Sequence, residues 1–227
     1  GMMYQQGGSL YNKTVTELAF TNDDKFAKGL EFWRSLVTEK CMLNPNSRSN
    51  HGTIIVSEFY EQKVGMIYTT SSNIVSFSKQ AKENNYELEV LPFPKKTDYF
   101  TNQGGSGIII LDNKPQKEID AAAEFLRWLN KPSNIAKMCK TSGYLPLHPA
   151  AMNEPELVEV YEETPLLKTA AELMIFGVKS PQGKAKVACD SEINKYCKYI
   201  WTEPDMSIEE IVKAVTERAQ YTIEANQ

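Results

Sequence analysis

Serine is the residue that could supply a catalytic nucleophile here, but the sequence lacks the pattern that activates it. Gly105-Ser106-Gly107 does not have the Gly-x-Ser-x-Gly spacing that places a serine on a strand-to-helix elbow. A serine nucleophile also needs a general base, and the only histidines, His51 and His148, do not assemble a Ser-His-Asp set. We therefore expect no nucleophilic catalysis.

Paired carboxylates are a second possible source of chemistry. Glu162-Glu163 and Glu209-Glu210 lie in charged helical stretches, where a solvated helix face explains them. Asp190 and Glu192 stay open as the acid/base pair of a glycoside-acting enzyme. That chemistry requires two carboxyl groups that face each other across a cleft, with separated pKa values. Spacing in the sequence cannot establish such a geometry.

Metal and cofactor motifs are missing from the sequence. The four cysteines, Cys41, Cys139, Cys189 and Cys197, include no Cys-x-x-Cys pair, and the histidines are far apart, so a zinc site is not expected. There is no Gly-x-x-x-x-Gly-Lys phosphate loop, and the glycines at 104–107 precede a predicted strand, whereas the dinucleotide fingerprint follows one. We expect four reduced thiols and no cofactor.

Small and hydroxylated residues gather in loops near the predicted strands. These loops are Gly7-Gly8, Thr69-Thr70-Ser71-Ser72, Gly104-Gly105-Ser106 and Gly143-Tyr144. Open α/β sheets bind ligands outside the carboxyl ends of their strands, and a helix that begins at 70–72 offers an N-terminal anion site. The loops predict a ligand-binding site, although each taken singly can equally be a turn or a helix cap.

Hydrophobic periodicity predicts an α/β fold. The expected helices cover 23–39, 73–83, 115–130, 132–141, 154–162, 164–175, 190–200 and 207–225, and the expected strands cover 64–69, 86–91 and 108–111. Residues 53–62 fit either a strand or a short helix. Ser207 and Glu210 predict a capping box, and Gly143 predicts a left-handed helix end. Short strands separated by helices, with a helical tail, indicate a layered α/β protein.

Composition is typical of a globular protein and argues against nucleic-acid binding. The 227 residues are 41% hydrophobic and 24% charged, and the net charge is −4. A nucleic-acid-binding surface needs a basic face to replace phosphate counterions. No apolar run reaches the ~20 residues that span a bilayer, and the first residues lack the features of a signal peptide.

Five stretches resemble, in their order and spacing, one protein family. They are 6–11 with the helix around Trp33, 59–66, 69–72, 90–92 with 104–105 and the helix at 123–129, and Thr141-Ser142-Gly143-Tyr144-Leu145-Pro146, which is the most specific. In the second stretch Gln62 stands where the family usually has Gly. The chain resembles the C-terminal part of an extracellular solute-binding protein of an ABC importer. It is similar to the glycerol-3-phosphate-binding and sugar-binding members, maltodextrin binders included.

The resemblance implies a periplasmic-binding-protein type II-like fold, in which two lobes close on a ligand between them. It also implies a truncated chain, with a C-terminal lobe at 1–104 and 157–227 and a hinge crossing with a segment of the N-terminal lobe at 105–156. The helix at 115–130 and the strand at 108–111 would then lack a surface that they normally pack against. Because bare apolar faces and strand edges associate, we expect the chain to self-associate.

The resemblance further implies a set of ligand-binding residues. They are Ser71, Ser72, Gly104, Gly105, Tyr144, Asp190 and Ser191. Asp190 and Ser191 stand at the start of a helix where the glycerol-phosphate-binding members carry an Arg. A carboxylate repels phosphate, so this departure makes a neutral sugar at least as suitable a ligand as a polyol phosphate.

The implied function is the substrate-binding component of an ABC transporter, which captures a sugar, an oligosaccharide or glycerol-3-phosphate and delivers it to the permease subunits. Such a protein is not an enzyme, and it would be extracellular or periplasmic and anchored to the membrane in its full-length form. Two alternatives stay open: a glycoside-acting α/β enzyme, and a fragment of a binding protein that no longer binds ligand.

Overall fold

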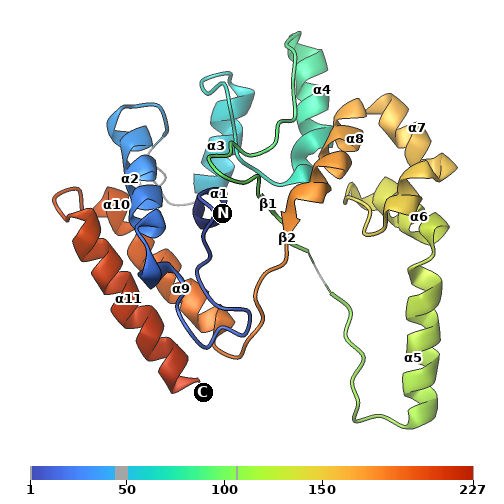
Figure 1. The fold of residues 1–227 in the computed structure, drawn as a ribbon. Helices are drawn as coiled ribbons and strands as arrows, with labels where there is room; N and C mark the ends of the chain where they lie inside the picture. The colour runs from blue at the N-terminus through green and yellow to red at the C-terminus, as the bar shows by residue number, and fades with distance from the viewer. Residues whose placement is uncertain (1, 44–50, 106, 227) are drawn as a thin grey trace. The chain divides into compact units, whose positions relative to one another are not determined.

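The computed structural model describes residues 2–43, 51–105 and 107–226, and the chain divides into two compact units (Figure 1). Unit 1 comprises the described residues of Gly1–Ser57, Phe93–Asn102 and Val178–Gln227, and unit 2 comprises those of Glu58–Pro92 and Gln103–Gly177. Each unit therefore combines segments that are distant in the sequence.

Unit 1 is helical. Its elements are α1 (Met2–Gln5), η1 (Phe20–Asn22), α2 (Lys25–Thr38), α9 (Lys186–Cys197), α10 (Tyr199–Thr202) and α11 (Ile208–Ala225). Helices α9 and α11 lie side by side (Figure 1). Ile211, Val215, Ala219 and Ile223 recur every four residues along α11 and are fully buried, since this spacing keeps them on one face of the helix. Together with Cys189 and Ile193 of α9 they form the centre of the unit 1 core.

A loop closed by an antiparallel bridge between Tyr11 and Leu18 packs on this core. Val15, in the middle of the loop, has a φ of 55° although it is β-branched and almost fully buried. That backbone region is unfavourable for a valine. The surrounding core therefore holds Val15 in a conformation that its own residue type disfavours.

Unit 2 is also mainly helical. Its elements are η2 (Ser71–Asn73), α4 (Ile74–Asn84), α5 (Gln116–Leu129), α6 (Pro132–Ser142), η3 (Pro149–Asn153), α7 (Pro155–Glu163), α8 (Pro165–Glu172) and η4 (Leu173–Phe176). Its core joins α4, α6, α7 and α8 through Ile74, Ile135, Cys139, Leu157 and Leu167. Helix α3 (His51–Tyr60) contains the boundary between the units at 57/58. Helix α5 contributes no buried residue.

The predicted helices form, with small shifts at their ends. Residues 53–62, which fit either state, are helical in α3, and the predicted helix at 190–200 begins earlier, at Lys186, and is divided into α9 and α10. Ser207 and Glu210 make the expected capping box. Gly143 ends α6 in the left-handed conformation with a φ of 70°. These features depend on local sequence, which explains why they could be predicted.

The three predicted strands do not form, and this corrects the sequence analysis. In the described residues the only ladder is the two-stranded sheet of β1 (Thr101–Asn102) and β2 (Gly177–Val178). The predicted strands at 64–69, 86–91 and 108–111 have no regular structure, and Met66 and Ile109 are 86% and 83% exposed. Strand propensity reflects how well a side chain fits a pleated, half-buried surface. Without paired neighbours these segments have no such surface to fit.

The two units are bounded differently from the predicted segments 1–104, 105–156 and 157–227. Residues 58–92 and 157–177, for example, lie in unit 2 together with most of the segment at 105–156. The units describe compactness within this chain. The assignment of the three segments to lobes therefore stays a prediction.

Candidate ligand-binding site

Ser71 and Ser72 lie in η2, directly before α4. The Thr70 hydroxyl oxygen accepts a hydrogen bond from the Ser72 backbone N–H at 3.4 Å and lies 3.2 Å from the Ser72 hydroxyl. One residue further on, the Asn73 amide donates to the Thr69 hydroxyl at 2.8 Å. The Thr-Thr-Ser-Ser run therefore caps the start of the helical segment, as predicted. Ser72 is exposed, so its hydroxyl can also reach a ligand.

Gly104 and Gly105 follow β1 and are open to solvent. A Cβ placed on either glycine would meet no atom within 4 Å. Packing within unit 2 therefore does not require glycine at either position. An open glycine pair exposes backbone N–H and C=O groups, and a ligand can approach them closely.

Tyr144 follows the left-handed Gly143 at the end of α6. Its backbone N–H donates to the Ser142 hydroxyl at 3.3 Å, and its side chain is 55% exposed. An exposed ring with a phenolic hydroxyl provides an apolar face for stacking and a polar end for hydrogen bonding. This combination is suited to a sugar.

Asp190 lies in α9 and already has two partners inside unit 1. The Tyr11 hydroxyl donates to its carboxylate at 2.9 Å, and Lys186, one helical turn earlier, forms an ion pair with it. Burial, together with the hydrogen bond to Asp190, raises the pKa of Tyr11 far above its ordinary value. The carboxylate thus attaches the loop that begins at Tyr11 to α9. The neighbouring Ser191 is exposed.

The seven predicted residues are divided between the units. Ser71, Ser72, Gly104, Gly105 and Tyr144 belong to unit 2, whereas Asp190 and Ser191 belong to unit 1. Within unit 2 they lie in three separate segments, which are η2, the residues after β1 and the end of α6. In unit 1, Ser191 is exposed, whereas the Asp190 carboxylate is already held by Tyr11 and Lys186.

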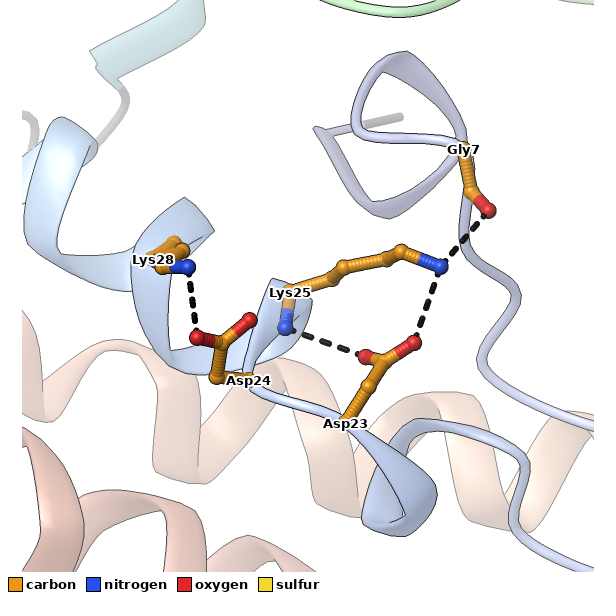
Figure 2. A network of polar contacts seen from close by, with 5 residues as sticks. All are labelled: Gly7, Asp23, Asp24, Lys25 and Lys28. Atoms are coloured by element: carbon orange, nitrogen blue, oxygen red, sulfur yellow. Dashed lines mark hydrogen bonds and ion pairs between the residues drawn. The ribbon is translucent and has the colours of Figure 1, made fainter.

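The Gly7-Gly8 loop is held by contacts with α2. Figure 2 shows the Lys25 ammonium between the Asp23 carboxylate, at 2.9 Å, and the Gly7 carbonyl oxygen, at 3.2 Å. The hydrogen bond from Lys25 lowers the pKa of Asp23 below its ordinary value. Gly7 has a φ of 72°, where a residue other than glycine would be strained. These contacts explain the loop as a structural turn.

Residues considered for catalysis or metal binding do not form a site in the described part of the chain. Asp190 and Glu192 are two residues apart on one helix, so they point in different directions. His148 caps η3 by accepting from the Ala150 backbone N–H at 3.1 Å. No group of three His, Cys, Asp or Glu among the described residues could hold a metal ion. Ser106 and the side chain of His51 lie outside what is described.

Sequence reasoning missed the partners that hold Asp190. The Lys186–Asp190 pair has the i, i+4 spacing typical of helical ion pairs, and recognising that α9 begins at Lys186 would have revealed it. Tyr11 is 179 residues away in sequence, and no local signal links the two.

No described helix is long and apolar enough to cross a membrane.

This chain is similar in sequence to one protein-family model and to individual periplasmic binding proteins. The family model described as "Bacterial extracellular solute-binding protein" matches residues 1–169. The sn-glycerol-3-phosphate-binding periplasmic protein UgpB of Escherichia coli K12 is 27% identical over 121 residues, which are 52% of this chain and 27% of that protein. The same protein of Yersinia pestis is 27% identical over 122 residues, covering 52% and 28%. The chain thus matches only about a quarter of the length of these curated relatives.

Solved structures match nearly the whole chain. The match to the cyclic alpha-maltosyl-1,6-maltose binding protein of Arthrobacter globiformis has a TM-score of 0.78 at 20% identity. It covers 99% of this chain and 54% of that protein. UgpB of Mycobacterium tuberculosis, solved with glycerophosphocholine, has a TM-score of 0.71 at 17% identity and covers 98%, with 54% of its own chain matched. These likenesses confirm the predicted α/β, periplasmic-binding-protein type II-like fold. Because the family model matches more than half of it, the chain belongs to the bacterial extracellular solute-binding protein family.

Proposed function

We propose that this chain captures a carbohydrate or a polyol phosphate outside the cytoplasm and delivers it, chemically unchanged, to the permease subunits of an ABC importer. The observation that carries the proposal is the likeness of 99% of the chain to a maltosyl-maltose binding protein. Family membership supports the extracellular or periplasmic location. In the longer protein we propose a membrane anchor, with 1–104 and 157–227 in the C-terminal lobe and 105–156 crossing to the other lobe.

A neutral carbohydrate suits the predicted residues better than a phosphate does. The set offers hydroxyls at Ser71, Ser72 and Ser191, backbone groups at Gly104 and Gly105, and the exposed ring of Tyr144. None of these side chains is cationic, whereas phosphate recognition commonly relies on Arg or Lys. The helix start at Ser71 and Ser72 is the one feature of the set that favours an anion. Lys186 lies one helical turn before Asp190, and its ammonium group is already paired with the Asp190 carboxylate.

Calorimetric titration of the 227-residue chain tests this proposal. The ligands are a maltose-type oligosaccharide, glycerol-3-phosphate and glycerophosphocholine. We expect saturable binding of the oligosaccharide, and Tyr144→Ala should weaken it about tenfold, or ~1.4 kcal/mol. Tyr221→Ala is the matched control, because Tyr221 is also an exposed tyrosine, on α11 and outside the predicted set, and it should not change affinity.

The other outcomes separate the alternatives. Binding of the phosphates alone would assign the polyol-phosphate class. Absence of binding to all three ligands would contradict capture by this chain and favour a fragment that does not bind ligand. Turnover of a chromogenic glycoside that is lost in Asp190→Asn or Glu192→Gln would favour the enzyme.

We also propose that the chain self-associates. Apolar side chains of unit 2 are exposed both in α5 and in the segment just before it, at Ile108, Ile109 and Leu111. Exposed apolar surface on a soluble protein, where it forms a large patch, commonly marks a site of association. Sedimentation velocity over a range of concentrations tests the proposal, and a sedimentation coefficient that does not change with concentration would contradict it.

A further inference from the structure

Asp190 remains partly open to solvent although two side chains already hold it. Its side chain is 36% exposed, whereas the side chain of Lys186 is 21% exposed and Tyr11 is 4% exposed. Both partners are therefore more deeply buried than the carboxylate that they contact. The neighbouring Ser191 is exposed as well. This part of α9 thus offers a ligand a carboxylate that more deeply buried groups hold in place.

Each oxygen of the carboxylate has one of these partners. The Tyr11 hydroxyl donates to Oδ1 at 2.9 Å, and the Lys186 ammonium group pairs with Oδ2. An ionised carboxylate can accept about four hydrogen bonds, shared between its two oxygens. Within the described part of the chain, these two contacts use about half of that capacity. The remaining positions can accept hydrogen bonds from a ligand that reaches the exposed side of Asp190.

Tyr11 is itself fixed by the backbone around it. It forms the antiparallel bridge with Leu18, and the next residue, Asn12, donates its N–H to the Glu17 carbonyl oxygen at 3.1 Å. The Tyr11 ring packs in the unit 1 core. A buried ring on a fixed backbone keeps its hydroxyl in one place, so the Asp190 carboxylate is oriented before a ligand arrives. Binding to a group that is already oriented costs less conformational freedom.

The charges of the pair favour a neutral ligand that donates hydrogen bonds. The positive charge of Lys186 offsets the negative charge of Asp190. The free positions on the carboxylate can only accept, so the ligand group that they contact must be a donor. A sugar hydroxyl is such a donor, whereas the oxygens of a fully ionised phosphate only accept and would face other acceptors.

We infer that Tyr11 and Lys186 are positioning residues, which orient Asp190 to accept hydrogen bonds from the hydroxyl groups of a neutral carbohydrate. The inference rests on the proposed function and specifies how one residue of the predicted set recognises the ligand. Tyr11 acts through Asp190 and does not touch the ligand itself. The two contacts thus link a loop far away in the sequence to the recognition of the ligand.

Calorimetric titration with maltotriose, as the maltose-type oligosaccharide, tests the inference. Asp190→Ala removes the acceptor and should weaken binding about tenfold, as expected for the loss of a hydrogen bond to a charged group. Tyr11→Phe keeps the ring and removes only the hydroxyl, and it should weaken binding about threefold. Tyr161→Phe is the matched control. Tyr161 is also a buried tyrosine, and its hydroxyl makes no hydrogen bond within the residues that the structure describes.

The combination of substitutions separates positioning from a structural role. Tyr11→Phe should have no further effect on affinity in the Asp190→Ala background, because Tyr11 acts only through that carboxylate. Lys186→Met, which keeps the stem and removes the charge, should behave in the same way. A purely structural role of Tyr11 would lower resistance to urea and leave affinity unchanged, or would lower affinity equally in both backgrounds.

Each titration uses a variant whose circular dichroism matches that of the parent chain. If Asp190→Ala does not fold, Asp190→Asn takes its place, since it keeps the shape of the side chain and removes its charge. The Asn variant should weaken binding by a smaller factor, and Tyr11→Phe should again add less to it than to the parent chain.

The outcomes distinguish this inference from the proposed function. A parent chain that binds maltotriose with an affinity unchanged by Asp190→Ala or by Tyr11→Phe would overturn the inference and leave capture of a carbohydrate standing. Asp190 would then serve only to attach the loop to α9. A parent chain that binds no maltotriose would overturn both the capture of this carbohydrate and the inference that depends on it.

Discussion

Asp190 shows how a residue type can suggest a role that its neighbours limit. The resemblance places it where the glycerol-phosphate binders carry an arginine, and predicts that it contacts ligand. In the structure its carboxylate receives the Tyr11 hydroxyl and pairs with Lys186. A carboxylate with two partners in a half-buried site stabilises the fold first, since removing either partner would leave a desolvated polar group.

The glycines differ in whether close packing requires a residue without a side chain at their position. A Cβ added to Gly104 or Gly105 would meet no atom within 4 Å, whereas Gly183 lies against the loop that contains Val15. A Cβ on Gly183 would lie 2.1 Å from the carbonyl oxygen of Thr14. Backbone atoms cannot move aside as a flexible side chain can. Gly183 is therefore required by close packing.

Gly183→Ala should destabilise the chain by about 1–3 kcal/mol, because the new methyl group overlaps backbone atoms. Urea unfolding measures this loss. Gly52→Ala is the matched control: Gly52 lies in α3 with open space around it, and alanine in a helix should add roughly 0.5–1 kcal/mol of stability. If both variants unfolded at the same urea concentration as the parent chain, the packing of Gly183 against Thr14 would be refuted.

At the scale of elements, helices and strands differ in what determines them. Helix α11 contains its own hydrogen bonds, its apolar stripe and its cap within eighteen residues and the preceding serine. The predicted strands at 64–69, 86–91 and 108–111 had suitable residues but needed partners elsewhere. A strand gains hydrogen bonds only from a neighbour. Helix prediction from this sequence therefore succeeded where strand prediction failed.

Ser207→Ala should lower stability by about 1 kcal/mol, the usual value of an N-cap. The serine hydroxyl accepts from the Glu210 N–H at 3.1 Å, and the Glu210 carboxylate accepts from the Ser207 N–H at 2.8 Å. Hydrogen exchange should become faster in the first turn of α11. Ser207→Thr retains the acceptor and should exchange like the parent chain; an equal loss in both variants would mean that the cap does not stabilise α11.

At the scale of the whole molecule, the described residues form two hydrophobic cores, one in each unit. The unit 1 core is centred on α9 and α11, and the unit 2 core joins α4, α6, α7 and α8. The chain spans about half the length of the solved structures it matches. Helix α5 contributes no buried residue to the unit 2 core, and Phe125 and Trp128 on it are exposed.

Unit 1 should lose stability at alkaline pH. Burial raises the pKa of Cys197 from 9.0 to about 12, and burial also raises the pKa of Cys189 and Tyr11. In each case the folded form holds its proton more tightly than the unfolded form. The stabilisation is therefore complete below about pH 9 and is lost as pH rises toward 12.

Urea unfolding in the presence of a reductant, measured from pH 8 upward, checks this expectation. The free energy of unfolding should fall steadily above about pH 9. Cys197→Ala should make this decline shallower, whereas Cys41→Ser should not, because Cys41 is exposed. A parent chain with constant stability from pH 8 to 11 would contradict the assignment.

The sequence by itself determined the family, the helices and two of their ends, the cap at Ser207 and the stop at Gly143, because these depend on motifs and on interactions between residues a few positions apart. It also identified the exposed loop residues Ser72, Gly104 and Tyr144 as candidates for ligand binding. Only the tertiary structure decided that Tyr11 and Lys186 are the partners of Asp190, that Gly183 must be a glycine and that α5 adds no buried residue to the unit 2 core. The reason is that each of these depends on contacts between segments far apart in the chain, which local patterns do not encode.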